Sequence, residues 1–189
     1  MKKILLTFLF VNIFMNNSYS QEKEFIFSKE RLTDFVVTDC EGKSQSELFR
    51  KTLDWVAITY KTPKEVIKAQ IENEYIRIEG SSDGMFCFKA LGQLNCQEAI
   101  YQIEISFKDN KYKFDIIELK RYIVPSQYVT GGWRDFDLNS NEEYYNKKGE
   151  IRNTYKISAE NIPNYFNNLN NSLKKFILNE NIPSKSNDW

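Results

Sequence analysis

Apolar and polar residues alternate through the middle of the chain, which is the pattern of strands that bury one face. The clearest run is residues 99–107, where apolar side chains occupy every second position. Shorter alternating or β-rich runs are residues 34–38, 76–79, 86–88 and 112–116. The pattern therefore predicts five short strands, of which the last four follow one another directly.

Turn-forming residues divide these last four runs at residues 81–84, Gly92-Gln93 and Asp109-Asn110. A two-residue turn at Asp109-Asn110 pairs apolar with apolar residues, namely Phe107 with Tyr112, Ile105 with Phe114 and Ile103 with Ile116. A two-residue turn at Gly92-Gln93 places Phe86 opposite Ala99, Cys87 opposite Glu98 and Cys96 opposite Lys89. Turns and pattern together predict an antiparallel meander.

After Ile116 the apolar phase slips by one residue, because Ile117 and Leu119 are both apolar. A β-bulge would re-aim these side chains. The interpretation we favour is that the following segment partly covers the outer face of the sheet, where Ile100, Ile117 and Leu119 form a patch that Trp133 caps. The alternative for Trp133, which follows two glycines, is an exposed ligand-stacking side chain. Tyr144 is the second weak ligand-binding candidate.

Two segments have the apolar spacing of helices. The first is residues 44–60, capped by Ser44 or Ser46 and ended before Pro63, with Trp55 at the edge of an apolar face of Leu48, Phe49, Leu53, Val56 and Tyr60. The second is residues 162–178, with Pro163 in its first turn and a stripe of Ile162, Tyr165, Phe166, Leu169, Leu173, Phe176 and Ile177. A long loop is expected at residues 124–156, with a hairpin around Lys148-Gly149, and a flexible tail at 179–189.

These elements predict an α+β fold with a single antiparallel sheet, in the order β-α-β-β-β-β-α and with both helices on one face. One domain is expected at residues 31–178. An N-terminal extension at 21–30 precedes it.

The first 20 residues have the order of a secretory leader, with Lys2 and Lys3, an apolar run over residues 4–15, and small side chains at Ser18 and Ser20. The apolar run is shorter than the roughly 20 residues that span a bilayer, so we expect no membrane insertion. The sequence predicts export, to the periplasm or the exterior.

Composition narrows the classes of function. Without the two leader lysines, 24 basic side chains face 26 acidic ones, and a formal net charge of −2 gives no reason to bind nucleic acid. The chain contains no histidine, which excludes Ser-His and Cys-His catalysis and histidine metal sites. Of the three cysteines, Cys87 and Cys96 come out as diagonal neighbours, for which a disulfide can form but is not favoured, and Cys40 is the odd thiol.

Two groups of acidic residues carry weak chemical signals. Oxygen-bearing side chains recur at every second position in Asp135, Asp137, Asn139, Asn141 and Glu143, a spacing that can serve Ca²⁺. Ser140 and Asn146 break the EF-hand pattern, so a solvated polar loop is the favoured interpretation. Glu104 and Asp115 face each other in the predicted hairpin; an exposed pair offset by Arg77 or Lys113 is favoured over a catalytic one.

Part of the chain resembles a family of exported bacterial proteins, mostly from Bacteroidetes, described as a domain of unknown function with a TATA-binding-protein-like fold. The likeness rests on residues 44–49 (SQSELF), Trp55, residues 63–67 (PKEVI) and the strand-turn-strand of residues 101–114. It covers roughly residues 30–122 and implies half of a TATA-binding-protein-like unit. Residues 83–87 depart from the glycine-rich strand usual at that place. The family brings no catalytic residues to this chain.

The function expected from these features is a non-enzymatic binding or accessory module of the cell envelope, with an envelope protein or a small ligand as its partner. No catalytic residue, cofactor, metal or nucleic acid is expected. The alternative is a hydrolase that uses only carboxylates. A deep pocket lined by two acids would favour the hydrolase, and a shallow sheet face or loop rim would favour binding.

The leader pattern predicts that the mature chain begins at Gln21. The intact mass of the secreted protein is the measurement. A mass that retains residues 1–20 contradicts the prediction.

Overall fold

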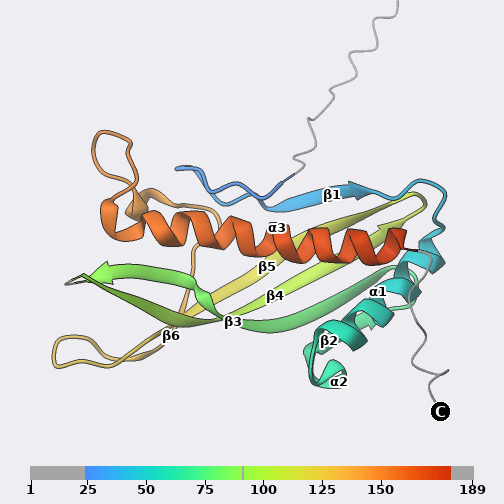
Figure 1. Ribbon diagram of the computed structural model, residues 1–189, viewed down its shortest axis with the longest axis horizontal. Coiled ribbons are helices and arrows are strands. Elements are labelled where there is room, and N and C mark those ends of the chain that lie inside the picture. Colours follow the sequence, from blue (N-terminus) through green and yellow to red (C-terminus); the bar gives the residue numbers. More distant parts are fainter. Residues whose placement is uncertain (1–23, 91, 180–189) are drawn as a thin grey trace, which may run out of the picture.

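A six-stranded antiparallel sheet forms the body of the protein in a computed structural model that describes residues 24–90 and 92–179 (Figure 1). The spatial order is β1-β5-β4-β3-β2, and β6 pairs with the end of β5. The strands are β1 (Phe35–Asp39), β2 (Ile67–Ile71), β3 (Tyr75–Ala90), β4 (Gln93–Lys108), β5 (Lys111–Ile123) and β6 (Gly132–Asp135). The α+β class and the single antiparallel sheet predicted from the sequence are confirmed.

Helices α1 (Gln45–Thr59) and α3 (Lys156–Leu178) pack on one face of this sheet (Figure 1). The other elements of the described residues are the short helix α2 (Pro63–Val66) and the 3₁₀ turns η1 (Glu142–Tyr144) and η2 (Asn153–Tyr155). Ser44 caps α1 by accepting a hydrogen bond from the amide of Glu47. Val56 is fully buried as expected, Leu53 is half-buried, and Trp55, expected at the edge of the stripe, lies in the core.

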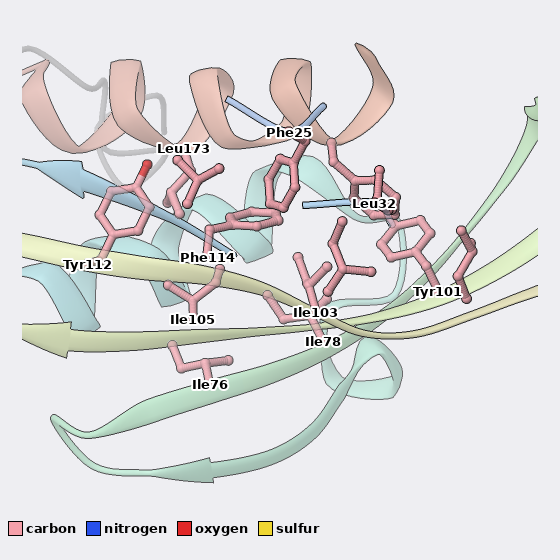
Figure 2. Packing of buried hydrophobic residues seen from close by; sticks show 14 of the residues in the cluster. Phe25, Leu32, Ile76, Ile78, Tyr101, Ile103, Ile105, Tyr112, Phe114 and Leu173 are labelled. Carbon is pink, nitrogen blue, oxygen red and sulfur yellow. The ribbon is translucent and has the colours of Figure 1, made fainter. Parts of the chain in front are cut away.

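The core lies between the sheet and α3. Figure 2 shows Ile76, Ile78, Ile103, Ile105 and Phe114 pointing from the strands toward Phe25 and the helix residue Leu173. Phe25 is buried and its ring packs edge-on against that of Phe114, with 5.7 Å between the ring centroids. The domain therefore includes part of the segment expected to be a separate extension at residues 21–30. Residues 1–23, and with them the expected leader, lie outside the described residues.

The hairpin between β4 and β5 has the predicted register. Phe107 pairs with Tyr112, Ile105 with Phe114 and Ile103 with Ile116. Asn110 adopts φ 67° in the turn, a left-handed conformation that Asn tolerates better than most residues. Local turn chemistry and the apolar pattern agree here, so the sequence alone predicts the pairing.

The phase slip after Ile116 is a β-bulge, so the covered outer face favoured from the sequence is wrong. Ile116 pairs with Ile103 and Glu118 with Gln102, which leaves Ile117 as the extra residue. Leu119 is then turned into the core and is 1% exposed. Ile100 pairs with Lys120 rather than facing Leu119, and no patch of Ile100, Ile117 and Leu119 exists.

The expected turn at residues 81–84 is an irregularity inside one long strand. Ser82 faces Ala99 and Phe86 faces Gln97, so residues 83–85 stand opposite Glu98 alone. Three side chains of α3 donate to carbonyl oxygens of this segment: Tyr165 to Ser81 at 3.4 Å, Asn161 to Gly84 at 2.7 Å and Ser158 to Cys87 at 2.8 Å. The sequence pattern missed β2, which pairs only with residues 75–78. The helix thus bonds carbonyls on the part of β3 that β2 does not cover.

The register of the β3–β4 hairpin also differs from expectation. Pairing runs to Ala90 opposite Gln93, and Gly92 adopts φ 80°. Cys87 and Cys96 are therefore direct partners, not diagonal neighbours, with Cα atoms 4.1 Å apart and a disulfide between them. Cys40 is a buried free cysteine, and burial raises the pKa of its thiol to about 11.

Segment 124–156 contributes to the fold instead of forming one structureless loop. It contains β6 and two 3₁₀ turns, and Tyr145 pairs with Ile151 around the predicted Lys148-Gly149 hairpin. Helix α3 starts at Lys156, so Pro163 lies inside the helix and not in its first turn.

Asparagine side chains on α3 bond to distant segments. Asn167 accepts from the amide of Phe25 at 2.7 Å and donates to its carbonyl at 3.0 Å. Asn170 accepts from the Tyr112 hydroxyl at 2.7 Å and donates to Thr38 at 3.1 Å, which joins the helix to β5 and β1. All three members of this second group are buried.

We predict that Asn170→Ala lowers the free energy of unfolding by about 1–3 kcal/mol, because Thr38 loses its buried partner and Tyr112 keeps only the longer bond to a backbone carbonyl. Urea denaturation monitored by circular dichroism measures the change. Asn171→Ala, at an exposed position of the same helix, is the matched control and should stay within about 0.5 kcal/mol. Equal losses in the two variants would contradict this role for Asn170.

Candidate functional site: a tyrosine-lined cleft

The two facing carboxylates predicted in the sheet, Glu104 and Asp115, each form an ion pair on the outer face. Glu104 stands opposite Asp115 as predicted. Arg77 contacts Glu104 at 2.9 Å and Lys113 contacts Asp115 at 2.7 Å. Each carboxylate thus has its own cation, as expected of a structural pair.

The oxygen-rich stretch of segment 124–156 does not converge on one point. Asp137 accepts from the amide of Asn139 in a local turn. Asn141 is buried and donates to the carbonyl of Ser28, while Glu143 lies 3.6 Å from Arg121. Within the described residues no group of three or more acidic or cysteine side chains is placed to hold a metal ion.

The two aromatic candidates lie apart from each other. Tyr144 is 1% exposed and packs against Phe27, Phe136 and Tyr155 in the core. Trp133 is 39% exposed and is paired with Tyr122 across β5 and β6. The centroids of the two rings are 5.4 Å apart. Trp133 is therefore accessible to a ligand, whereas Tyr144 is a buried residue of the core.

A cleft lies at the open edge of β3, and sequence analysis did not predict it. The pairing of β2 with β3 reaches only as far as Ile67 opposite Ile78, so within the described residues β3 has no strand on that side from Glu79 onward. The cleft is open to solvent and has a volume of about 680 Å³, within the range of ligand clefts, roughly 300–1,000 Å³. Its lining comes from the end of α1, from α2, β2, β3, β4 and α3: Thr59, Tyr60, Lys61, Thr62, Glu65, Val66, Lys68, Glu79, Gly80, Ser81, Glu98, Ile100, Tyr101, Tyr165 and Leu169.

Three tyrosine hydroxyls form a chain in the cleft. The Tyr60 and Tyr101 oxygens are 3.1 Å apart, and Tyr165 lies 3.0 Å from Tyr101. Tyr60 and Tyr165 are half-buried, and Tyr101 is 1% exposed, at the edge of the core in Figure 2. The C-cap residue of α1 and residues of β4 and α3 therefore meet through their hydroxyl groups.

Gly80 allows this meeting because it is the direct strand partner of Tyr101. A Cβ atom at Gly80 would overlap the hydroxyl and ring of Tyr101. The tyrosine ring thus lies over the glycine backbone, and its hydroxyl reaches the open edge of the strand.

Burial keeps these phenols neutral. It raises the pKa of Tyr60 to about 12, and it raises the pKa of Tyr101 and Tyr165 further above the ordinary value. At neutral pH the three hydroxyls are therefore hydrogen-bonding groups and not nucleophiles or bases.

Charged groups at the cleft are partly paired. Lys68 contacts Glu79 at 2.9 Å, and Gln102 donates to the same carboxylate at 3.0 Å. The hydrogen bond from Lys68 is the main cause that lowers the pKa of Glu79, with the bond from Gln102 adding to it. Lys61, Glu65 and Glu98 lie exposed around the rim.

The sequence concealed this site because its tyrosines fit the apolar stripes of a helix, a strand and a second helix. Tyr60, Tyr101 and Tyr165 read as core positions. A signal in the sequence was Gly80 directly after the alternating run of residues 76–79, since glycine in a strand marks a close approach of other atoms.

Comparisons with known proteins support the fold. Residues 35–121 match the family described as a domain of unknown function (DUF4468) with TBP-like fold. The crystal structure of a DUF4468 family protein from Bacteroides ovatus is similar with a TM-score of 0.55 at 12% identity, over 85% of this chain and 92% of that one. A TBP-like protein from Parabacteroides distasonis has a TM-score of 0.55 at 14% identity, over 77% and 91%. No curated protein matches the chain.

We predict that Gly80→Ala destabilises the protein by about 1–3 kcal/mol, because the added methyl group must displace the Tyr101 ring. Gly84→Ala is the matched control, since a Cβ atom there meets nothing within 4 Å. Urea denaturation measures both variants, and tyrosine ring resonances in NMR spectra report whether Tyr101 moves. Equal stability of the two variants would show that Tyr101 does not need the glycine.

Proposed function

We propose that this chain, which belongs through residues 35–121 to the DUF4468 family with a TBP-like fold, is a non-enzymatic binding module. The family is one of unknown function, and the proposal is based on the cleft. Its ligand would occupy the cleft at the open edge of β3. The protein would act in the cell envelope, as a periplasmic or secreted component.

The observation that carries this proposal is the chain of neutral tyrosine hydroxyls. Tyr60 and Tyr165 are half-buried hydrogen-bonding groups of the cleft and are joined through the buried Tyr101. Their raised pKa values suit the three phenols to binding and not to proton transfer near neutral pH. Apolar side chains beside them, Val66, Ile100 and Leu169, add the contact area of a ligand site.

The carboxylate-only hydrolase remains the second candidate because Glu65, Glu79 and Glu98 line the same cleft. A carboxyl group that donates a proton near neutral pH needs a raised pKa. Glu79 has a lowered pKa and is engaged by Lys68 and Gln102, so it suits the role of a fixed acceptor. Glu104 and Asp115 are each neutralised on the outer face. These arrangements favour binding.

Two features support export. The leader pattern of residues 1–20 is the first. The Cys87–Cys96 disulfide is the second, because such bonds persist in oxidising compartments. Of the helices in residues 24–90 and 92–179, none has the length and apolar character needed to cross a bilayer.

The outer face of the sheet gives no support to a nucleic-acid partner. Its cations are matched by anions in the pairs Arg77–Glu104, Lys113–Asp115, Lys68–Glu79 and Lys120–Glu118. Binding to phosphates requires a surplus of basic groups on one surface.

The proposal predicts that at least one soluble ligand raises the melting temperature of the mature chain and is recovered with unaltered mass. The panel contains neutral, anionic and cationic oligosaccharides and short peptides. Ser81→Trp, which places a large side chain at an exposed position in the cleft, should abolish the rise. Lys89→Trp, at an exposed position of the same strand outside the cleft, should leave it intact.

Two results would reject a binding module with this cleft as its site. One is a ligand recovered in cleaved form, which would favour the hydrolase. The other is a panel in which no melting shift depends on Ser81.

A further inference from the structure

The tyrosine chain can orient its protons in two ways. Tyr165 donates either to Tyr101 at 3.0 Å or to the carbonyl of Ser81 at 3.4 Å, since a phenol has one proton. In the first arrangement Tyr101 donates to Tyr60, and the Tyr60 proton is left for the cleft. In the second arrangement Tyr60 donates to Tyr101 and offers the cleft only its lone pairs.

Tyr60 is therefore the end of a reversible chain and can donate to a ligand or accept from it. A hydroxyl group on the ligand has the same double capacity, whereas an ammonium group only donates and a carboxylate only accepts. Hydrogen-bonded chains of this kind strengthen one another when all members point the same way. The reversible end thus suits a partner rich in hydroxyl groups.

The charged side chains around the cleft are of both signs and give a charged ligand little net attraction. Three carboxylates, Glu65, Glu79 and Glu98, stand beside two lysines, Lys61 and Lys68. Lys68 and Glu79 already neutralise each other, and Gln102 holds the carboxylate in place. What such a rim offers a neutral ligand is fixed donors and acceptors.

Apolar surface lies beside these polar groups in Val66, Ile100 and Leu169. The C–H faces of a sugar ring are apolar and its edges carry hydroxyl groups, so one ring can use both parts of this lining. The cleft is open to solvent, which accommodates an internal or terminal unit of a longer chain.

We infer that the cleft recognises a neutral saccharide, with Tyr60 as the hydroxyl that reads its hydroxyl groups. The inference rests on the proposed binding function and deepens it. Lys68 and Glu79 act as a fixed donor and acceptor pair toward the same ligand, and their mutual ion pair keeps either from attracting a charged competitor.

Titration calorimetry on the mature chain tests the inference with defined probes. They are neutral tetrasaccharides of glucose, mannose, galactose, xylose and N-acetylglucosamine, with an oligogalacturonate tetramer as the anionic probe and a chitosan tetramer as the cationic probe. We expect a neutral tetramer to bind with an affinity that stays within about twofold between low and high salt, because no charge is screened.

Tyr60→Phe should weaken that binding by about 3–10-fold, the effect of removing one neutral hydrogen bond. Tyr128→Phe, at a tyrosine that is 86% exposed and outside the cleft, makes the same chemical change and should leave the affinity unchanged. Melting curves of both variants verify that they fold.

The outcomes separate this inference from the proposed function. Binding of only the charged tetramers, lost in Ser81→Trp, overturns the saccharide inference and leaves the binding module standing. Failure of every neutral tetramer to bind overturns the inference, as does unchanged affinity in Tyr60→Phe. The absence of any ligand that depends on Ser81 rejects the proposed function as well.

Discussion

The attachment of helix α3 to the sheet is the constraint on which the rest of the structure depends. Its apolar stripe supplies the driving force, with Ile162, Phe166 and Leu173 fully buried. Burial alone is non-directional and leaves the position of a helix along the sheet open. Polar side chains fix that position, because Ser158 and Asn161 bond to β3, Asn167 to the N-terminal segment, Asn170 to β1 and β5, and Ser172 to Trp55 of α1. Polar side chains of α3 thus bond to β1, β3, β5, α1 and the N-terminal segment.

The attachment of α3 also covers part of the edge of β3. Strand β2 covers only residues 75–78, and a bare edge beyond that point would invite pairing with other chains. Helix α3 covers the irregular part of the edge through side-chain bonds to the carbonyls of Ser81, Gly84 and Cys87. The cleft lies just beyond the residues of β3 that pair with β2, where the helix begins to cover the strand. Tyr165 belongs to both arrangements, since it reaches the Ser81 carbonyl and the tyrosine chain.

The two faces of the sheet use charge and polarity in different ways. On the outer face Arg77 forms an ion pair with Glu104 of the neighbouring strand, and Lys113 forms one with Asp115 of its own strand. Such half-exposed pairs add little stability. On the helix face the polar groups are few, mostly uncharged and hydrogen-bonded, as the Tyr112–Asn170–Thr38 group illustrates. The tyrosine chain continues this neutral chemistry to the surface, and the proposed match of the cleft to hydroxyl-bearing ligands rests on it.

The sequence by itself determined the features that neighbouring residues control. These are a serine cap of α1 at Ser44 or Ser46, the turn at Asp109-Asn110 with its register, and the apolar stripes that put α1 and α3 on one face of an antiparallel sheet. Tertiary structure decided the rest, because partners distant in sequence supply the bonds. Residues 81–84 have the local sequence of a turn. They are held within a strand by two residues of α3, Asn161 bonded to Gly84 and Tyr165 bonded to Ser81, over separations of 77 and 84 residues along the chain. The bulge at Ile117, the direct pairing of Cys87 with Cys96 and the meeting of Tyr60, Tyr101 and Tyr165 likewise depend on how strands and helices align, and side-chain periodicity does not encode that alignment.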